Sequence, residues 1–173
     1  MPDEFQTFDP AADPPLLRSV RCARLLDYWN GLRGNRPFPS RDEIDPSLLK
    51  PILPHIMLVS LEYDPFRAFY RLVGTEIVRF AKFDFTGRYA DALRFQNDET
   101  VDWTIFYRQV AEDRRPGLGL TYWTVSPELR RWIEFLICPL SSDGTTIDRC
   151  IALEDYEPLN LNEIDSLPPV EEQ

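Results

Sequence analysis

The stretch Tyr70-Arg71-Leu72-Val73-Gly74-Thr75, followed by Asp84-Phe85-Thr86-Gly87-Arg88, decides the fold of this chain. The first segment predicts a strand that ends at Gly74, where glycine can adopt backbone angles closed to other residues. Thr75 then offers a hydroxyl to the first free amides of a helix. Asp84 can bond nearby backbone amides and so hold a tight turn. None of these residues is poised for chemistry, which favours a module that encloses or senses something over one that transforms it.

Length, composition and charge narrow the class of protein. A chain of 173 residues fits one domain with tails, and 43% apolar residues suffice for a core without metals or disulfides. The net charge of −10 repels phosphate backbones, so nucleic-acid binding is not expected. No apolar run approaches the roughly 20 residues of a membrane span, and the N-terminus lacks the features of a secretory signal. We therefore expect a cytoplasmic protein that binds no membrane.

The cysteines and the single histidine do not predict a metal site. Cys22, Cys138 and Cys150 lie far apart and form no CxxC pair, and His55 is the only imidazole. A structural zinc site would therefore have too few conventional ligands. We expect the thiols to be buried and reduced, behaving as small hydrophobic groups.

The chain divides into an arm, a domain and a tail. Residues 1–15 are acidic and proline-rich and are expected to form a flexible arm, and residues 154–173 an acidic tail. The domain covers 16–153, with a helix over 16–34 and a core over 56–153. The apolar stripe of that helix is expected to cover the sheet. Three apolar residues lie off the stripe and predict a homodimer or partner surface, with the N-terminal arm as the alternative cover: Leu16, Val20 and Ala23.

The order of predicted elements indicates an α+β fold. Two strands, 56–63 and 68–73, precede short helical turns over 74–98 and a longer helix over 98–114. Three further strands, 117–123, 131–138 and 146–153, are joined by short turns and must be antiparallel neighbours. We expect a five-stranded antiparallel sheet with a helical cap on one face and the N-terminal helix on the other.

Several motifs in this order resemble a PAS domain. They are Tyr28-Trp29-Asn30-Gly31-Leu32-Arg33-Gly34, Pro37-Phe38-Pro39-Ser40-Arg41, Ile44-Asp45-Pro46, Leu53-Pro54-His55, Tyr70 to Thr75, Thr86-Gly87-Arg88 and Pro139 to Gly144. The chain is most similar to a bacterial single-domain PAS subfamily long catalogued as a domain of unknown function. The resemblance covers about 16–153. It implies a five-stranded PAS fold and a role in sensing or in docking to partners, and it implies neither one ligand nor a catalytic residue. Lys82-Phe83 departs from the pattern, where a small and a polar residue are expected.

The resemblance raises two cofactors that the residues do not support. A haem-binding PAS domain needs an axial ligand, usually a histidine on a helix beside the cavity, whereas His55 stands at the entrance to the first strand. We expect His55 to be a structural hydrogen bonder. A flavin photosensor of the thiol-adduct type needs a cysteine in its cavity helix, and residues 75–98 contain none. No cofactor is expected.

Alternation along the last hairpin predicts a candidate ligand pocket. Ile133, Phe135 and Ile137 carry no charge and are placed under the cap, with Leu118, Leu120 and Tyr122 opposite them. Core packing is the alternative for all of these residues. The full candidate lining is Phe80, Phe85, Arg88, Phe106, Tyr107, Val110, Leu118, Leu120, Tyr122, Ile133, Phe135 and Ile137.

These observations favour a stand-alone sensory or regulatory module of signal transduction. It would bind a protein partner, with or without a small apolar ligand. An enzyme of the cone-shaped α+β kind, an isomerase or dehydratase, is the alternative; two carboxyl groups facing into a cavity would support it, and a filled core would exclude it. A scaffold without a ligand is a third hypothesis.

Overall fold

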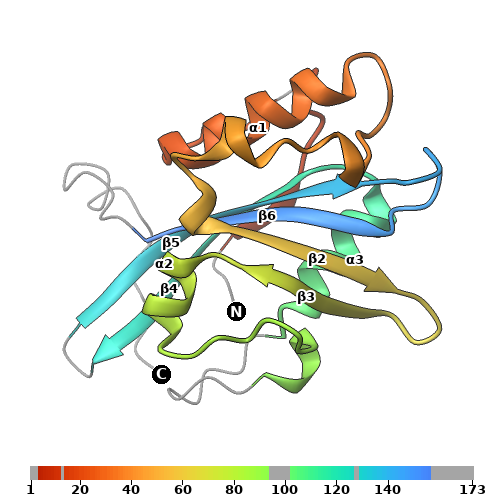
Figure 1. Cartoon of the computed structure of the whole chain (residues 1–173). Coiled ribbons are helices and arrows are strands. Elements are labelled where there is room, and N and C mark those ends of the chain that lie inside the picture. The colour runs from red at the N-terminus through yellow and green to blue at the C-terminus, as the bar shows by residue number, and fades with distance from the viewer. Residues whose placement is uncertain (1–3, 13, 94–101, 127–128, 157–173) are drawn as a thin grey trace.

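The computed structural model describes residues 4–12, 14–93, 102–126 and 129–156. Six strands form one sheet: β1 (Glu4–Thr7), β2 (Ile56–Glu62), β3 (Arg67–Val73), β4 (Gly117–Ser126), β5 (Leu129–Leu140) and β6 (Arg149–Asp155). Their order is β1-β4-β5-β6-β2-β3, and every neighbouring pair is antiparallel. The α+β class and the antiparallel sheet with its helical cap are confirmed. The first and last strands of the predicted core, β2 and β6, lie side by side in the middle (Figure 1).

Helices cover both faces of the sheet. Helix α1 (Val20–Arg33) lies across one face, while α2 (Thr75–Ala81) and α3 (Thr104–Asp113) lie against the other (Figure 1). Four short 3₁₀ segments complete the chain: η1 (Arg41–Glu43), η2 (Pro46–Leu49), η3 (Leu53–His55) and η4 (Ala90–Ala92). We call the side of α2 and α3 the cap side and the other the α1 side. Helix α1 begins at Val20, because Ser19 caps it, rather than at the predicted residue 16.

Helix α3 is shorter than the prediction of 98–114. It begins at Thr104 and ends at Asp113, and the predicted residues 98–101 lie outside the described part of the chain. Asp102 precedes the helix, and its Oδ1 accepts a hydrogen bond from the amide of Thr104 at 3.0 Å. The predicted strand turn at 127–128 also lies outside the described residues.

The expectation of a flexible arm over residues 1–15 is wrong for residues 4–7. They form β1, which pairs with β4 from Glu4 opposite Leu120 to Thr7 opposite Gly117. The ring of Phe5 stacks on Phe135 with centroids 5.7 Å apart and contacts Phe106 at 4.7 Å. The strand is held because this aromatic side chain fills a space above the β4 backbone.

Two glycines of β4 create that space. A Cβ atom on Gly117 would lie 2.4 Å from Cζ of Phe5, and one on Gly119 would lie 2.0 Å from Cζ of Phe135. Real Cβ contacts are never that short, so a larger residue would displace either ring. The Gly-Leu-Gly sequence therefore marks the place where aromatic rings lie directly on the sheet.

The stretch around Gly74 forms the predicted strand, turn and helix, but for a different reason. Gly74 itself is the N-cap of α2, with an ordinary φ of −64° and no side-chain cap, so Thr75 does not cap the helix. A Cβ atom at Gly74 would lie 2.2 Å from the carbonyl oxygen of Pro54. Glycine is thus required here by the close approach of η3, not by its backbone angles.

The turn that begins at Asp84 is confirmed and covers the free edge of β3. Asp84 Oδ1 accepts a hydrogen bond from the amide of Thr86 at 2.9 Å, and Gly87 takes a φ of 81°. The amide of Gly87 then donates to the carbonyl of Tyr70, and the amide of Tyr70 donates to the carbonyl of Arg88. This pairing protects backbone groups that an edge strand would otherwise leave open.

Candidate functional site

A small cavity lies on the cap side, beneath α2. Its volume is about 20 Å³, which is room for about one water molecule. Its lining is apolar except for two phenols and one carboxyl group, and consists of Tyr70, Ile77, Phe80, Ala81, Phe85, Trp103, Ile133, Glu154 and Tyr156. The interior is therefore nearly filled by the chain's own aromatic side chains.

The predicted pocket residues divide into four groups. Phe80, Phe85 and Ile133 line the cavity. Beside them, the cap-side core contains five further predicted residues, all buried: Phe106, Tyr107, Val110, Phe135 and Ile137. Arg88 does not line the cavity; its side chain is exposed, its amide donates to the carbonyl of Phe85, and its carbonyl accepts from the amide of Tyr70. The fourth group consists of three residues of β4.

The placement of Leu118 and Leu120 under the cap is wrong. In the observed register Leu118 pairs with Leu136 and Leu120 with Glu134. Directly opposed residues share a face, so Leu118 and Leu120 belong to the α1 side, whereas Gly117 and Gly119 oppose Ile137 and Phe135 on the cap side. The side chain of Tyr122, the third predicted residue, lies outside the described part of the structure. The predicted alternation within each strand is correct, but the predicted register between β4 and β5 is shifted by one residue.

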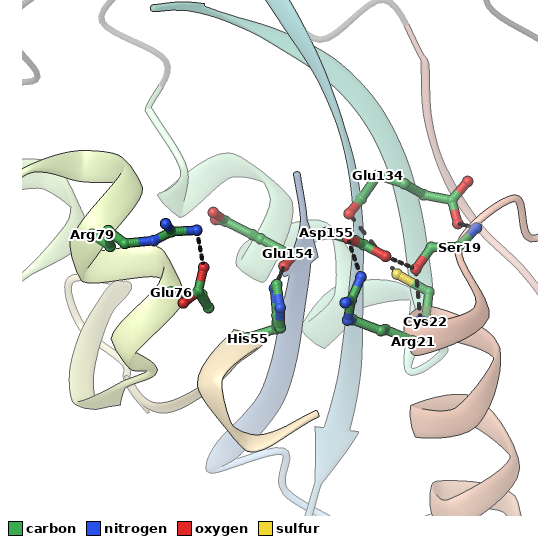
Figure 2. Close-up of polar contacts among 9 residues, drawn as sticks. All are labelled: Ser19, Arg21, Cys22, His55, Glu76, Arg79, Glu134, Glu154 and Asp155. Atoms are coloured by element: carbon green, nitrogen blue, oxygen red, sulfur yellow. Dashed lines mark hydrogen bonds and ion pairs between the residues drawn. The ribbon is translucent and has the colours of Figure 1, made fainter. Parts of the chain in front are cut away.

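Glu154 is the polar residue of the cavity that the sequence prediction missed. It was assigned to the tail, but β6 continues to Asp155, and Glu154 lies opposite Phe135 and faces the cap side. Figure 2 shows its carboxyl group directed toward α2, away from Asp155. The alternation Cys150, Ala152, Glu154 along one face of β6 was the available signal.

Burial sets the protonation of this carboxyl group. Desolvation raises the pKa of Glu154 to about 7, and the hydroxyl of Tyr156, which donates a hydrogen bond to Oε2, opposes part of that rise. A buried carboxyl that binds a proton near neutral pH can respond to pH or to a hydrogen-bonding ligand.

Two stacked rings form part of the cavity lining. Phe80 of α2 and Tyr156, just after β6, have centroids 4.0 Å apart and planes inclined by 13°. Behind them, Nδ1 of His55 lies 3.0 Å from the carbonyl oxygen of Glu154. Because a carbonyl only accepts, that nitrogen carries the proton, and the expectation of a structural histidine at the strand entrance is confirmed. A ligand larger than water requires side chains of the lining to move.

A second polar cluster fixes the start of α1 to the sheet (Figure 2). The carboxylate of Glu134 accepts hydrogen bonds from the amides of Arg18, at 3.0 and 3.1 Å, and Ser19, at 2.8 Å. Ser19 Oγ donates to Asp155 Oδ2 at 2.6 Å and accepts from the amide of Cys22 at 3.0 Å. Arg21 pairs with Asp155 at 3.0 Å. Burial raises the pKa of Glu134, and the two amides limit that rise.

Two apolar side chains beside this cluster face solvent. Leu16 is 85% exposed and Val20 is 83% exposed, whereas Ala23, the third residue predicted for a partner surface, is half-buried. Residues 4–7 pair with β4, and the described part of the N-terminal segment, 4–12 and 14–15, leaves this pair exposed. A hollow of about 210 Å³, lined in part by Pro15, Leu16 and Leu120, lies next to it.

The remaining predicted features concern cysteines, metals and membranes. Cys22, Cys138 and Cys150 are buried and unbonded thiols, as expected. Within residues 4–12, 14–93, 102–126 and 129–156, no three His, Cys, Asp or Glu side chains are grouped to hold a metal ion. No helix in the same ranges is long and apolar enough to cross a membrane.

Comparison with known proteins places the chain in a family. Three solved structures resemble it: an RNA-binding Light-Oxygen-Voltage receptor (16% identity, 74% of this chain and 40% of that chain, TM-score 0.47), the light state of the blue-light photoreceptor Aureochrome1 LOV (12%, 69% and 91%, 0.43), and a Light-Oxygen-Voltage domain studied with a flavin analogue (15%, 69% and 90%, 0.45). The chain thus spans less than half of the first of these. No curated protein matches. The family model described as "PAS domain" matches residues 17–153, and the chain therefore belongs to the PAS domain family.

Proposed function

We propose that this PAS domain is a regulatory module of signal transduction that binds a protein partner through the surface formed by Leu16 and Val20. The observation that carries the proposal is the exposure of these two apolar side chains on either side of backbone amides bound by Glu134. Glu134 holds the amides of Arg18 and Ser19, the residues between them, so the surface is fixed before a partner arrives. A preorganised apolar surface loses less conformational entropy on binding than a mobile one.

The first partner to test is a second copy of this chain. Sedimentation analysis at high micromolar concentration is expected to give a dimer for the wild type and a monomer for the double variant Leu16→Glu, Val20→Glu. Leu48→Glu is the matched control, because Leu48 is also an exposed apolar side chain, 59% exposed, and belongs to a different element, η2. A wild-type protein that stays monomeric throughout would exclude the homodimer, and a dimer unaffected by the double variant would exclude this surface.

The cavity beneath α2 supplies the sensing part of the proposal. Its apolar lining and single carboxyl group suit a small, largely apolar molecule that carries one hydrogen-bond donor for Glu154. Binding would separate the rings of Phe80 and Tyr156 and so change the position of α2 relative to the end of β6. A ligand shifts such an equilibrium only as far as its affinities for the closed and open forms differ.

Native mass spectrometry of protein purified from its own host tests this part. The expected result is a retained small molecule that Glu154→Gln weakens, with Glu76→Gln on the surface of α2 as the control. A protein that retains no small molecule and binds no hydrophobic probe would instead favour the scaffold hypothesis. The enzyme hypothesis finds less support, because its criterion was two inward carboxyl groups and the cavity lining contains one among the described residues.

A further inference from the structure

A separate hollow of about 380 Å³ lies on the α1 side, over the strand pair β2–β3 and the start of β6. Three arginines from three different elements surround it: Arg41 of η1, Arg71 of β3 and Arg149 of β6. Leu58 and Leu72 form its apolar wall. The net charge of the chain is −10, so a concave surface with three guanidinium groups is unusual within it.

Strand geometry gathers these side chains around one hydroxyl. Ser60 is 7% exposed, and its Oγ accepts hydrogen bonds from Nε of Arg71 at 2.9 Å and from a terminal nitrogen of Arg149 at 3.4 Å. The register passes from Leu58 opposite Leu72 to Val59 opposite Tyr70, so Arg71 is the extra residue of a β-bulge. Bulges re-aim a side chain, and here the bulge directs Arg71 across the face toward Ser60.

The arginines of the hollow have no acidic partner within the described chain, and this separates them from most arginines nearby. Arg21, Arg36, Arg67 and Arg79 each form an ion pair with a carboxylate. Two acidic residues close in sequence are engaged elsewhere: Glu43 binds Arg36, and Glu62 accepts from the hydroxyl of Tyr89. Arg41, Arg71 and Arg149 form no ion pair in residues 4–12, 14–93, 102–126 and 129–156.

Ser60 positions two of the three arginines. Its oxygen already accepts from two guanidinium groups, while no acceptor for its own proton is present among the described residues. Ser60 does not itself line the hollow, so its hydroxyl acts by holding the guanidinium groups of Arg71 and Arg149 in place. An anion lying between the arginines would neutralise their repulsion.

We propose that this hollow binds the phosphoryl group of a small phosphorylated metabolite. Three guanidinium forks offer more donors than the two oxygens of a carboxylate can use, whereas a phosphoryl group has three oxygens and up to two charges. The volume matches that of pockets for small ligands, and Leu58 and Leu72 offer apolar contact to the rest of the molecule. The site lies on the opposite face from the cavity beneath α2 and does not depend on the function proposed above.

Titration of ¹⁵N-labelled full-length protein tests this site. Ribose 5-phosphate and inorganic phosphate are the probes, and ribose is the uncharged control. We expect saturable chemical-shift changes at the amides of Ser60, Arg71 and Arg149 with both phosphates and none with ribose. Because binding is charge-driven, the affinity should fall as salt is added. Arg71→Gln and Arg149→Gln should each weaken binding by about tenfold or more, the range for losing a charge-assisted hydrogen bond.

The control variant is Arg24→Gln, which removes the same charge from an exposed position on α1. It should change the affinity by no more than about twofold, because screening weakens distant surface charges. Arg71→Lys keeps the charge without the fork and should be intermediate. Spectra that are unchanged away from the site establish folding of each variant. Non-saturating shifts, equal losses in Arg24→Gln and Arg71→Gln, or binding seen only with a phosphoserine peptide would each overturn the proposal.

Discussion

Glu134 and Asp155 lie directly opposite each other on β5 and β6, and both carboxyl groups bind the start of helix α1. Like charges at opposed positions of a sheet ordinarily destabilise it. Here each is engaged by a different partner: Glu134 by the amides of Arg18 and Ser19, and Asp155 by Ser19 Oγ and Arg21. The pair therefore fixes where α1 begins and how Leu16 and Val20 are presented to solvent.

Replacing Ser19 with alanine should destabilise the protein by about 1–2 kcal/mol, because one hydroxyl both caps α1 and binds Asp155. Chemical denaturation measures the loss. Ser40→Ala is the matched control: Ser40 caps only the short, exposed segment η1 and should cost less. Equal losses in the two variants would show that the contact with Asp155 adds nothing.

Glu154 predicts how stability depends on pH. Its pKa is 4.5 in an ordinary environment and about 7 in the folded protein. Below about pH 4.5 the carboxyl group is protonated in both the folded and the unfolded state, and its contribution to stability is fully present. Between about pH 4.5 and 7 the unfolded chain releases the proton while the folded protein keeps it. The contribution therefore falls as pH rises and is lost once pH passes through the folded pKa of about 7. The loss amounts to about 3 kcal/mol at most.

Glu154→Gln should remove this dependence while keeping an acceptor for Tyr156. In thermal unfolding from pH 5 to pH 8, the stability of the variant relative to the wild type is therefore expected to increase as pH rises. Glu76→Gln, on the surface of α2, should show the same pH dependence of stability as the wild type. A constant gap between Glu154→Gln and the wild type would mean that Glu154 titrates normally.

Replacing a glycine with alanine should lower the stability of the protein at one position and raise it at another. Gly119→Ala places a Cβ atom 2.0 Å from Phe135 and should destabilise by about 1–3 kcal/mol through overpacking. Gly31→Ala meets nothing within 4 Å on the exposed side of α1 and should stabilise by about 0.5–1 kcal/mol, because alanine is the better helix former. Urea midpoints of the two variants on either side of the wild type are the expected result.

Local patterns in the sequence predicted most of the fold and only part of the site. The strand before Gly74, the turn at Asp84 and the antiparallel order of the last three strands depend on nearby residues, and they are confirmed. The register between β4 and β5 depends on which rings lie over Gly117 and Gly119, and that is decided by packing across the sheet. Glu154 was missed because an acidic residue at the end of a strand ordinarily belongs to the solvent-facing tail.

Local sequence patterns could not predict strand β1, because its four residues are held by partners more than a hundred positions away in the sequence. Phe5 packs on Phe106 and Phe135, and Thr7 Oγ1 donates to Asp113 Oδ2 at 2.6 Å. Phe5→Ala should therefore release β1 from β4 without unfolding the rest, because the other five strands pair independently of it.

Hydrogen exchange distinguishes this local release from global destabilisation. In Phe5→Ala the amide of Phe8, which donates to the carbonyl of Pro116 at 3.0 Å, should lose protection, while the amide of Tyr70, bonded to Arg88, should keep it. Thr7→Val, which removes a single exposed hydrogen bond, should have a smaller effect on the same amide. Equal acceleration at Phe8 and Tyr70 would mean that β1 and the central strands open as one unit.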